Sequence, residues 1–450
     1  MRLTILGGGG FRVPLVHRAL LGEESGVETV VLHDVDPARV RAIKAVLDDS
    51  AAGRGPEVVV EDDLEKSLNG TDFVFSAIRV GGLRGRTCDE RSALAEGVLG
   101  QETTGAGGIC YGLRTVPVAL RVAEAVRDHA PSAWVINFTN PAGMVTEAMS
   151  GVLGDRVIGI CDSPVGLFRR VARALDLDVE DAWFDYAGLN HLGWLQRVLV
   201  DGRDMLPALL ADDDALATFE EGRLFGGSWL RTLGAIPNEY LYYYYYTQDA
   251  IASIVEAPAT RGEFLLGQQE TFYRAVGDAS AGEAQPGAAA RWNEVRKERE
   301  ATYMAESRAA SGAGERHADD LDGGGYEKVA LALMQAIAAN EEAILVLNVR
   351  NRSALPGLDA DAVVEVPCLV GSNGAHPVAV SALDPHASAL VASVKEAERA
   401  ATDAAVTGSR AAAIKALAIH PLVGSVRTAE RILDRELRAL PELRAVLTGE

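Results

Sequence analysis

Leu3-Thr4-Ile5-Leu6 and the four glycines that follow them (LTILGGGG, residues 3–10) decide the fold of this chain of 450 residues. The apolar run predicts a short buried strand, and the residues after Gly10 predict a helix through Leu20. A glycine turn between a first strand and a first helix lets the backbone approach a pyrophosphate, and the helix N-terminus then meets the negative charge. We therefore expect a dinucleotide to bind at Gly7, Gly8, Gly9 and Gly10.

Asp34 supplies the second part of this signal, because it stands at the end of the next β-branched run, residues 27–33. An acidic residue there accepts hydrogen bonds from ribose hydroxyls and repels a 2′-phosphate, which favours NAD over NADP. Arg12 occupies the position of the third glycine in the common GxGxxG pattern. The glycine spacing alone is therefore a weak signal, and a tight turn in a nucleotide-free α/β domain is the alternative.

The first third of the chain alternates strands with helices. A strand is expected at 57–60 and buried strands at 73–78, 134–138 and 157–160, and helices are expected at 37–50, 115–129 and 142–150. This alternation is typical of a doubly wound parallel sheet. We predict an α/β protein whose N-terminal, Rossmann-like, NAD-binding domain spans residues 1–162.

Residues 163–450 show a different pattern. A β-hairpin is expected at 182–200 and further strands at 343–348 and 362–370, while the remainder is mostly helical. The Gly-rich, polar stretch 311–325 predicts a loop and is a candidate mobile lid. We expect a C-terminal, mostly helical α+β domain that serves substrate, metal and oligomerisation.

Composition and charge exclude several classes of protein. The chain carries 64 Asp and Glu against 43 Lys and Arg, a formal net charge of −21 that would repel nucleic acids and anionic lipids. No apolar run approaches the roughly 20 residues of a membrane span, and the N-terminus lacks the pattern of a signal peptide. Four cysteines without a CxxC pair fit a reduced, cytoplasmic compartment. We expect no nucleic-acid or membrane partner, and an anionic substrate would need a local cluster of arginines.

Polar side chains follow two of the predicted strands, where doubly wound sheets bind their ligands. Arg79, Arg84 and Arg86 come after the strand at 73–78 and are candidates for gripping an anion, although a solvated loop could pair them with its own carboxylates. Asn137 to Pro141 come after the next strand. Two amides beside a proline-fixed turn suit hydroxyl recognition, and ordinary turn chemistry is the alternative.

Cys161 stands at the end of the strand at 157–160, in GICD, and His191 lies within the expected hairpin at 182–200, in GLNH. Two such ligands would leave open positions on a divalent metal for substrate and water, as a catalytic metal requires. A single histidine or cysteine is more often structural. Five tyrosines, 242–246, follow Tyr240. Such a run favours helix packing with phenol tips in solvent, and a charge-tuned tyrosine base is the alternative.

Taken in order, these segments resemble glycoside hydrolase family 4, the NAD- and divalent-metal-dependent glycosidases, and most closely its 6-phospho-β-glucosidases. The resemblance covers nearly the whole chain. It rests on GGGG at 7–10, RVGGLRGR at 79–86, GVLGQETTGAGG at 97–108, NFTNPAGMVTEA at 137–148, GICD at 159–162, GLNH at 188–191, IPNEYLYYY at 236–244 and ATRGE at 259–263.

The resemblance implies a role for each matching residue. Cys161 and His191 would hold Mn²⁺ or another divalent metal. The catalytic groups would be Tyr240 as general base, Glu102 as the carboxylate that raises its basicity, and Asp162 as general acid. The phosphorylated sugar would be held by Arg86, Asn140 and Arg261.

The family mechanism differs from the usual two-carboxylate scheme of glycosidases. NAD⁺ removes hydride from carbon 3, the proton on carbon 2 becomes acidic, the aglycone leaves carbon 1, and water and hydride then return. No net oxidation results, so NAD⁺ acts as a catalyst. The implied substrate is a phosphorylated disaccharide or glucoside, and the implied assembly is a homodimer or homotetramer.

One residue departs from the 6-phospho-β-glucosidase pattern. Asp162 stands where many of those enzymes have asparagine, and aspartate there resembles the 6-phospho-α-glucosidases. The segments 97–108 and 137–148 favour the β group. We predict hydrolysis of 6-phospho-β-glucosides, with a 6-phospho-α-glucosidase or another family 4 glycosidase as the alternative. An NAD-dependent 2-hydroxy acid or sugar dehydrogenase and a non-catalytic nucleotide sensor are alternatives of other classes.

Overall fold

A computed structural model describes residues 1–22, 25–277, 287–316 and 325–448. Its N-terminal part is a six-stranded parallel sheet in the order β3-β2-β1-β4-β5-β6. Most of these strands are continuous apolar runs, as expected where helices cover both faces. The predicted Rossmann-like sheet is confirmed. Its strands are β1 Arg2–Leu6, β2 Thr29–His33, β3 Glu57–Val60, β4 Phe73–Ser76, β5 Trp134–Asn137 and β6 Val157–Gly159.

The helices around this sheet begin at clear signals. Asp36 caps the helix that starts with Pro37, because its carboxylate accepts from the amides of Ala38 and Arg39. The stretch after β4 was expected as a polar segment, but α4 forms there once Gly81 adopts a left-handed conformation (φ +80°). These helices are α1 Val13–Ala19, α2 Pro37–Ala51, α3 Leu64–Leu68, α4 Gly82–Leu94, α5 Ala106–His129 and α6 Ala142–Leu153.

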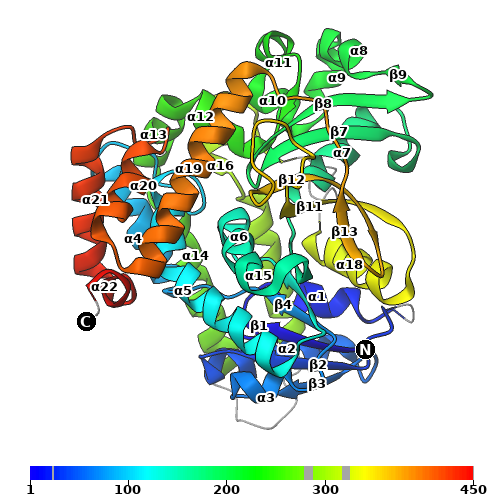
Figure 1. Ribbon diagram of the computed structural model, residues 1–450, viewed down its shortest axis with the longest axis vertical. Helices are drawn as coiled ribbons and strands as arrows, with labels where there is room; N and C mark the ends of the chain where they lie inside the picture. The colour runs from blue at the N-terminus through cyan, green and yellow to red at the C-terminus, as the bar shows by residue number, and fades with distance from the viewer. Residues whose placement is uncertain (23–24, 278–286, 317–324, 449–450) are drawn as a thin grey trace.

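The sheet does not stop at β6 but continues with antiparallel strands in the order β6-β11-β12-β7-β8-β10 (Figure 1). The expected hairpin is present as β7 and β8, joined by a turn at Asn190 and His191. The remaining strands are β7 Trp183–Leu189, β8 Leu192–Val200, β9 Arg203–Asp204, β10 Ile236–Pro237, β11 Ala343–Arg350, β12 Val363–Gly371 and β13 Gly374–Pro377.

The C-terminal part is mostly helical, as predicted. Its last four helices stack beside α4 and α5 at one side of the molecule (Figure 1). The helices are α7 Ser163–Ala174, α8 Leu206–Ala211, α9 Asp213–Ala217, α10 Glu220–Phe225, α11 Gly227–Leu233, α12 Tyr242–Tyr245, α13 Thr247–Glu256, α14 Arg261–Gly277, α15 Ala288–Ala301, α16 Ala305–Ser311, α18 Tyr326–Ala339, α19 Pro385–Thr407, α20 Arg410–Ile419, α21 Val426–Ala439 and α22 Pro441–Thr448. Most of the predicted lid, residues 317–324, lies outside the described residues.

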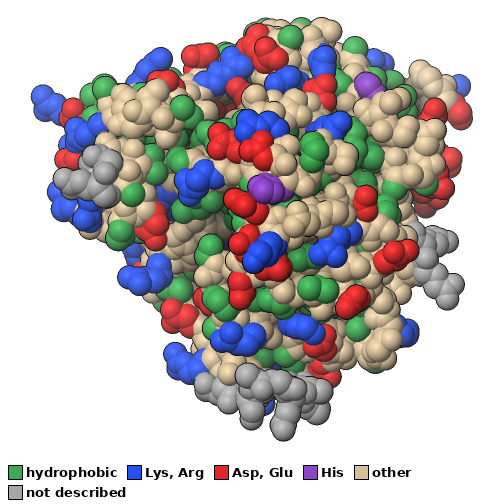
Figure 2. Space-filling view, turned by 60° about the horizontal axis from the view of Figure 1, so that its bottom comes forward, with side chains coloured by type: hydrophobic (Ala, Val, Ile, Leu, Met, Phe, Trp, Pro, Cys, Tyr) green, Lys and Arg blue, Asp and Glu red, His purple; other side chains and the backbone are tan. Residues whose placement is uncertain are grey.

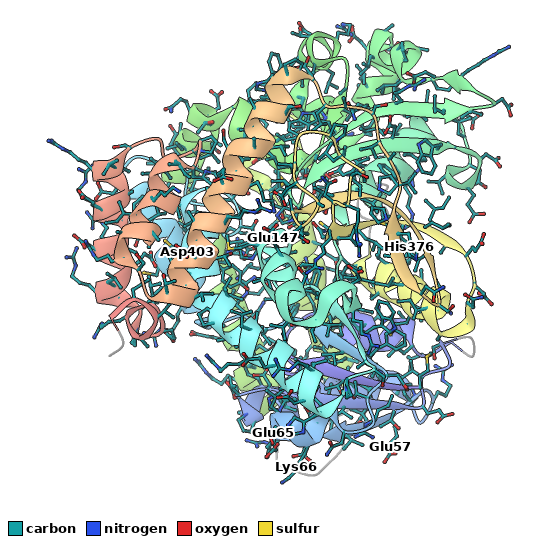
Figure 3. The ribbon with its side chains drawn as sticks, in the orientation of Figure 1. Glu57, Glu65, Lys66, Glu147, His376 and Asp403 are labelled. Carbon is teal, nitrogen blue, oxygen red and sulfur yellow. The ribbon has the colours of Figure 1, made fainter. Side chains whose placement is uncertain are left out.

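Helix α6 ties the two parts together. Its Glu147 accepts hydrogen bonds from Lys395 and Arg399 of α19 at 2.9 and 2.8 Å (Figure 3). The same carboxylate accepts from the amide of Val363, the first residue of β12, at 2.7 Å. The Glu147 carboxylate, which is only partly exposed, therefore joins α6 to both the sheet and α19.

Charged side chains of both signs are interspersed over the face seen in Figure 2. On this face, acidic and basic side chains therefore lie close to one another. Among the described residues, none of the helices combines the length and the apolar character that crossing a membrane requires.

Residues that are paired from one strand to the next form a continuous row across eight strands of the sheet. This row positions the site. On the parallel strands, four of the expected ligand residues follow this row by one to three positions: Gly7, Asp34, Asn140 and Cys161. Since the carboxyl ends of parallel strands share one edge, these residues come together there. From β2 to β7 the row contains His33, Leu6, Ser76, Asn137, Gly159, Asn348, Glu365 and Gly188.

Candidate active site

One cavity of about 1830 Å³ collects nearly all of the residues that the sequence predicted for the site. Gly8, Gly9 and Arg84 do not line it, but the residues that were given a catalytic, metal-binding, substrate-binding or other cofactor-binding role do. These are Gly7, Gly10, Asp34, Arg86, Glu102, Asn140, Cys161, Asp162, His191, Tyr240 and Arg261.

The glycine turn after β1 is shaped by close packing. Gly7 has φ +83°, and a Cβ on it would lie 2.6 Å from the carbonyl oxygen of Ala77. Gly8 and Gly9 face inward, where a Cβ would lie within 3 Å of Leu32 or Arg39. These two glycines therefore let the turn pack against β2 and α2, whereas Gly7 and Gly10 border the cavity.

Asp34 is fastened to this turn. Its two carboxylate oxygens accept from the amides of Gly9 and Asp36, both at 3.0 Å. A carboxylate has about four acceptor sites, so capacity remains for ribose hydroxyls from the cavity. The geometry places an acid beside the glycine turn, as the sequence predicted.

Arg12, the departure from the glycine pattern, extends toward the reactive part of the cavity. Its guanidinium lies 5.7 Å from the ring centre of Phe138 and 5.2 Å from that of Tyr326. Burial alone would lower the pKa of Arg12, but the carboxylate of Asp162 raises it above its ordinary value. Arg12 therefore brings a fixed positive charge toward Asp162.

The two expected metal ligands, Cys161 and His191, are buried at the wall of the cavity, only 5% and 8% exposed. Thr103 Oγ1 lies 3.0 Å from His191 Nδ1, which leaves Nε2 free to bind a ligand. Burial lowers the pKa of His191 to about 4, so the imidazole is neutral, as a metal ligand must be. Burial also raises the pKa of the Cys161 thiol, so a nearby cation would be needed to stabilise its thiolate.

A thiolate and a neutral imidazole form a donor set that fits a divalent transition metal. Elsewhere among the described residues, Asp89, Cys110 and Glu436 bring three ligand atoms within 4.8 Å of one another. There, however, Arg114 already holds both oxygens of Asp89 at 2.7 and 2.8 Å. A cation at that cluster would face a guanidinium, so the cluster does not fit a metal.

Tyr240 is held against the imidazole by the segment around it. The residues before it form β10, which pairs with β8, and Asn238 Oδ1 accepts from the Tyr240 amide at 3.0 Å. The phenol ring then stacks on His191 with centroids 3.7 Å apart and planes inclined by 5°. Burial, Glu239 and Glu102 raise the pKa of Tyr240, whereas a hydrogen bond that Tyr303 donates to its hydroxyl at 2.9 Å lowers it.

The following tyrosines differ from the expectation that their phenol tips reach solvent. Tyr242 and Tyr243 are only 1% exposed. Tyr243 donates to Glu306 at 3.0 Å, and Tyr246 donates to the carbonyl of Phe225 at 2.9 Å. Because these hydroxyls find partners inside the protein, the run is a packing element around the site.

Glu102 is anchored by two arginines of the segment after β4. Arg79 and Arg86 each approach its carboxylate to 2.8 Å. Burial alone would raise the pKa of Glu102, but these guanidiniums lower it well below its ordinary value. Glu102 is thus a fixed anion near Tyr240. Arg84, on the outer face of α4, is exposed and does not line the cavity.

A cluster of positive charge faces Glu102. Arg261 donates to Thr302 Oγ1 at 2.6 Å and to the carbonyl of Arg299 at 2.7 Å. Burial and Arg86 lower the pKa of Arg261 to about 10, and burial with its arginine neighbours lowers that of Arg299 further. Several guanidiniums thus crowd together in a chain whose net charge is −21, which favours an anionic ligand.

Two of the residues just described were missed in the sequence. Arg299 lies within a charge-rich helix, α15, which has the composition of a solvated surface. Tyr303 follows that helix without any motif. Asn140, which was predicted, has its Oδ1 buried with no partner among the described residues, so it can accept a hydrogen bond from a ligand.

Comparison with known families gives a direct match over almost the entire chain. The model described as "Family 4 glycosyl hydrolase" matches residues 2–177, and the model of its C-terminal domain matches residues 186–423. This chain belongs to the family 4 glycosyl hydrolases.

Named relatives of this family 4 glycosyl hydrolase act on phosphorylated glucosides. A probable 6-phospho-beta-glucosidase of Bacillus subtilis is 34% identical over 84% of this chain and 80% of its own length. The 6-phospho-beta glucosidase of Thermotoga maritima, solved with manganese, NAD+ and glucose-6-phosphate, is 26% identical with a TM-score of 0.80 over 98% of both chains. A 6-phospho-alpha-glucosidase from gut microorganisms, solved with NAD and Mn2+, is 26% identical with a TM-score of 0.79 over 98% of both chains. The dehydrogenase alternative is not favoured, since the matching family hydrolyses glycosides.

Proposed function

We propose that this family 4 glycosyl hydrolase cleaves 6-phospho-β-glucosides with NAD⁺ and Mn²⁺ as cofactors. The observation that carries the proposal is that one cavity joins three features. They are the glycine turn with Asp34, the Cys161, His191 and Tyr240 group, and the arginine cluster. Each feature suits one of the three components with which the Thermotoga maritima enzyme was solved: NAD+, manganese and glucose-6-phosphate.

The cofactors would be held by residues already placed at the cavity wall. Gly7, Gly10 and Asp34 would hold NAD⁺, and Cys161 and His191 would hold the metal. When bound, NAD⁺ supplies a hydride acceptor and the metal supplies a Lewis acid for the sugar oxygens.

The chain itself supplies the proton transfers. Tyr240 would take the proton from carbon 2, and its ring is fixed for this by the stack on His191. Glu102 places a negative charge near Tyr240, which raises its basicity. Asp162 lines the same cavity and would donate a proton to the leaving oxygen at carbon 1.

The arginine cluster would bind the sugar phosphate. Arg86, Arg261 and Arg299 all line the cavity, and planar guanidiniums match phosphate oxygens. The free Oδ1 of Asn140 would accept from a sugar hydroxyl. The 6-phosphate and the reacting carbons would thus be fixed at separate points, which orients the sugar.

The α-linked substrate is the second candidate. Asp162 resembles the α group, and solved relatives of both groups cover this chain equally. The segments 97–108 and 137–148 support the β assignment.

The test is hydrolysis of chromogenic 6-phospho-β- and 6-phospho-α-glucosides, with and without NAD⁺ and Mn²⁺. We expect turnover of the β-linked substrate only with both cofactors, and no accumulation of NADH. Turnover in excess chelator, or no turnover of any phosphoglycoside, contradicts the proposal. Faster turnover of the α-linked substrate would reassign the anomer.

Three further parts of the proposal concern the whole protein. They are a division into residues 1–162 and 163–450, a homodimer or homotetramer, and a cytoplasmic location. The last is supported by the chemistry of the substrate, since sugars are phosphorylated inside cells during uptake. Light scattering of the purified protein tests the assembly.

A further inference from the structure

The strands that lead to Cys161 and His191 are both joined to the β11–β12 hairpin, each by a single residue pair. β6 pairs with β11 only at Gly159 and Asn348, and β7 pairs with β12 only at Gly188 and Glu365. Asn348 and Glu365 are themselves partners across the hairpin. Two adjacent residues thus connect both ligand-bearing strands.

The side chains reinforce this backbone connection. Glu365 Oε1 accepts from Asn348 Nδ2 at 3.0 Å and from Asn190 Nδ2 at 3.1 Å. Its other oxygen accepts from the hydroxyl of Tyr186 at 3.0 Å. Asn190 directly precedes His191 in the turn, so one fully buried carboxylate links β11 to the His191 turn.

Neither end of this link can shift easily. A Cβ on Gly159 would lie 2.8 Å from Asn348 Cβ, so β6 and β11 are in direct contact beside Cys161. His191 has φ +62°, a left-handed conformation that a residue with a side chain rarely adopts unless its surroundings hold it. The hydrogen bond from Asn190 to Glu365 helps to keep the turn in this conformation.

Glu365 and Asn348 lie behind the site rather than in it. Neither lines the cavity, whereas Asn190, Cys161 and His191 do. Glu365 therefore acts on a ligand at a distance, through the residues it holds and through its charge near Cys161.

We propose that Glu365 and Asn348 are positioning residues that fix the separation of Cys161 and His191. The proposal rests on the proposed function in one respect: these two residues must hold the metal. Groups behind metal ligands commonly change metal affinity 10- to 100-fold when they are removed.

The experiment compares metal binding among variants by calorimetric titration with Mn²⁺. For Glu365→Ala we expect metal affinity to fall by roughly 10- to 100-fold, while NAD⁺ affinity changes less than about threefold. With Co²⁺ as probe, the thiolate-to-cobalt absorption should weaken. Glu365→Gln keeps an oxygen for Asn190 and Asn348, so it should restore most of the affinity.

The matched control is Asn351→Ala, just beyond the end of β11, the strand that carries Asn348. Asn351 is fully buried and holds the β11–β12 connection by donating to the carbonyls of Leu355 and Leu358. Its loss should destabilise the hairpin without changing metal affinity. An equal loss of affinity in Asn351→Ala and Glu365→Ala overturns the positioning role, as does unchanged affinity in Glu365→Ala.

Two more variants keep the test decisive. If Glu365→Ala fails to fold, Asn190→Ala is used instead, because it removes only the hydrogen bond between Asn190 and Glu365. Unchanged metal affinity in Asn190→Ala overturns the proposal. Cys161→Ser tests the metal assignment itself. If it retains full affinity, the proposed function fails; if it loses the metal while Glu365→Ala keeps it, only this inference fails.

Discussion

The phenol of Tyr240 lies between an imidazole and a second phenol. Its ring stacks on His191, and its hydroxyl accepts from Tyr303. The stack fixes the ring plane, and the hydrogen bond fixes the position of the oxygen. A base must lie within hydrogen-bond reach of the proton it removes, so these contacts determine where the substrate carbon must sit.

Tyr303→Phe should slow catalysis without affecting cofactor binding. The variant removes a hydrogen bond worth about 0.5–1.5 kcal/mol, so we expect kcat to fall by about 2- to 12-fold. Steady-state kinetics on the phosphoglucoside, with NAD⁺ affinity as control, measure this. A change in KM alone would show that Tyr303 binds substrate and does not assist the base.

Arg299→Ala should selectively weaken binding of phosphorylated substrates. Hydrogen bonds between charged groups contribute about 1.5–3 kcal/mol, so KM should rise by about 10- to 150-fold. Arg84→Ala, at the exposed arginine on α4, is the control and should change KM less than twofold. Inhibition constants of glucose-6-phosphate and glucose, measured in parallel, show whether the loss of affinity is specific to the phosphorylated sugar. Equal losses for both sugars would remove Arg299 from the phosphate site.

The residues predicted from motifs and those missed differ in one physical respect. Cys161, His191 and Tyr240 lie in recognisable local segments that follow strands. Thr103, Arg299, Tyr303 and Glu365 matter through contacts made across the fold. Thr103 lies in the motif at 97–108 and Glu365 in the predicted strand at 362–370, but neither pattern gives the side chain's partner. Contacts between residues so far apart in the chain cannot be predicted from a single sequence.

At the scale of elements, α4 serves two sides of the molecule. Arg86 and Glu90 pair on one face at 2.7 Å beside the cavity. Asp89 lies on another face and pairs with Arg114 of α5, next to Glu436 of α21. The site is thereby fastened to the C-terminal helices through buried charges.

Glu436→Gln should change how stability depends on pH. Burial and Asp89 raise the pKa of Glu436 from 4.5 to about 8. The folded state therefore keeps a proton that the unfolded chain releases above pH 4.5, so this group's contribution should decline between pH 4.5 and pH 8 and then level off.

We expect Glu436→Gln to raise Tm more at pH 8 than at pH 5, as thermal unfolding across that range would show. Glu430→Gln, at an exposed position on the same helix, should leave the pH dependence of Tm unchanged. The interpretation is wrong if the wild type and Glu436→Gln show the same slope of Tm against pH.

The elements show what composition can predict. β1, β2 and β4 to β6 were predicted because strands covered by helices are continuous apolar runs, and β3 was predicted from its three consecutive valines although it is only partly buried. α4 was missed because its sequence, GLRGRTCDERSAL, is polar and contains glycine, and its buried arginine and carboxylates are stabilised only by tertiary partners. β13 was missed because it is a four-residue strand that depends on β12 for pairing.

For the whole molecule, the acidic surface and the basic cavity have opposite signs. A net charge of −21 repels anions at a distance, whereas the arginine cluster attracts them at close range. At low ionic strength the long-range repulsion extends further, so screening should favour the approach of phosphorylated substrates.

NAD⁺ should stabilise the entire fold. A ligand at 100 times its Kd adds about 2.7 kcal/mol to the free energy of unfolding. We expect saturating NAD⁺ to raise Tm and Gly7→Ala to abolish that shift, because an added Cβ would meet the Ala77 carbonyl at 2.6 Å. Gly22→Ala is the control, since a Cβ there meets nothing within 4 Å. An undiminished shift in Gly7→Ala would remove the glycine turn from the cofactor site.

The continuous sheet also bears on recombination between relatives. A chimera that joins residues 1–162 of one homologue to the remainder of another would have to rebuild the seam between β6 and β11. A single Cβ added to Gly159 would collide with both Asn348 across the seam and Thr146 of α6. Shuffled proteins should therefore fold only when the parent of residues 1–162 carries glycine at position 159 and the other parent carries a side chain at position 348 that packs against it. The crossover most easily suggested by the sequence thus cuts through a continuous sheet.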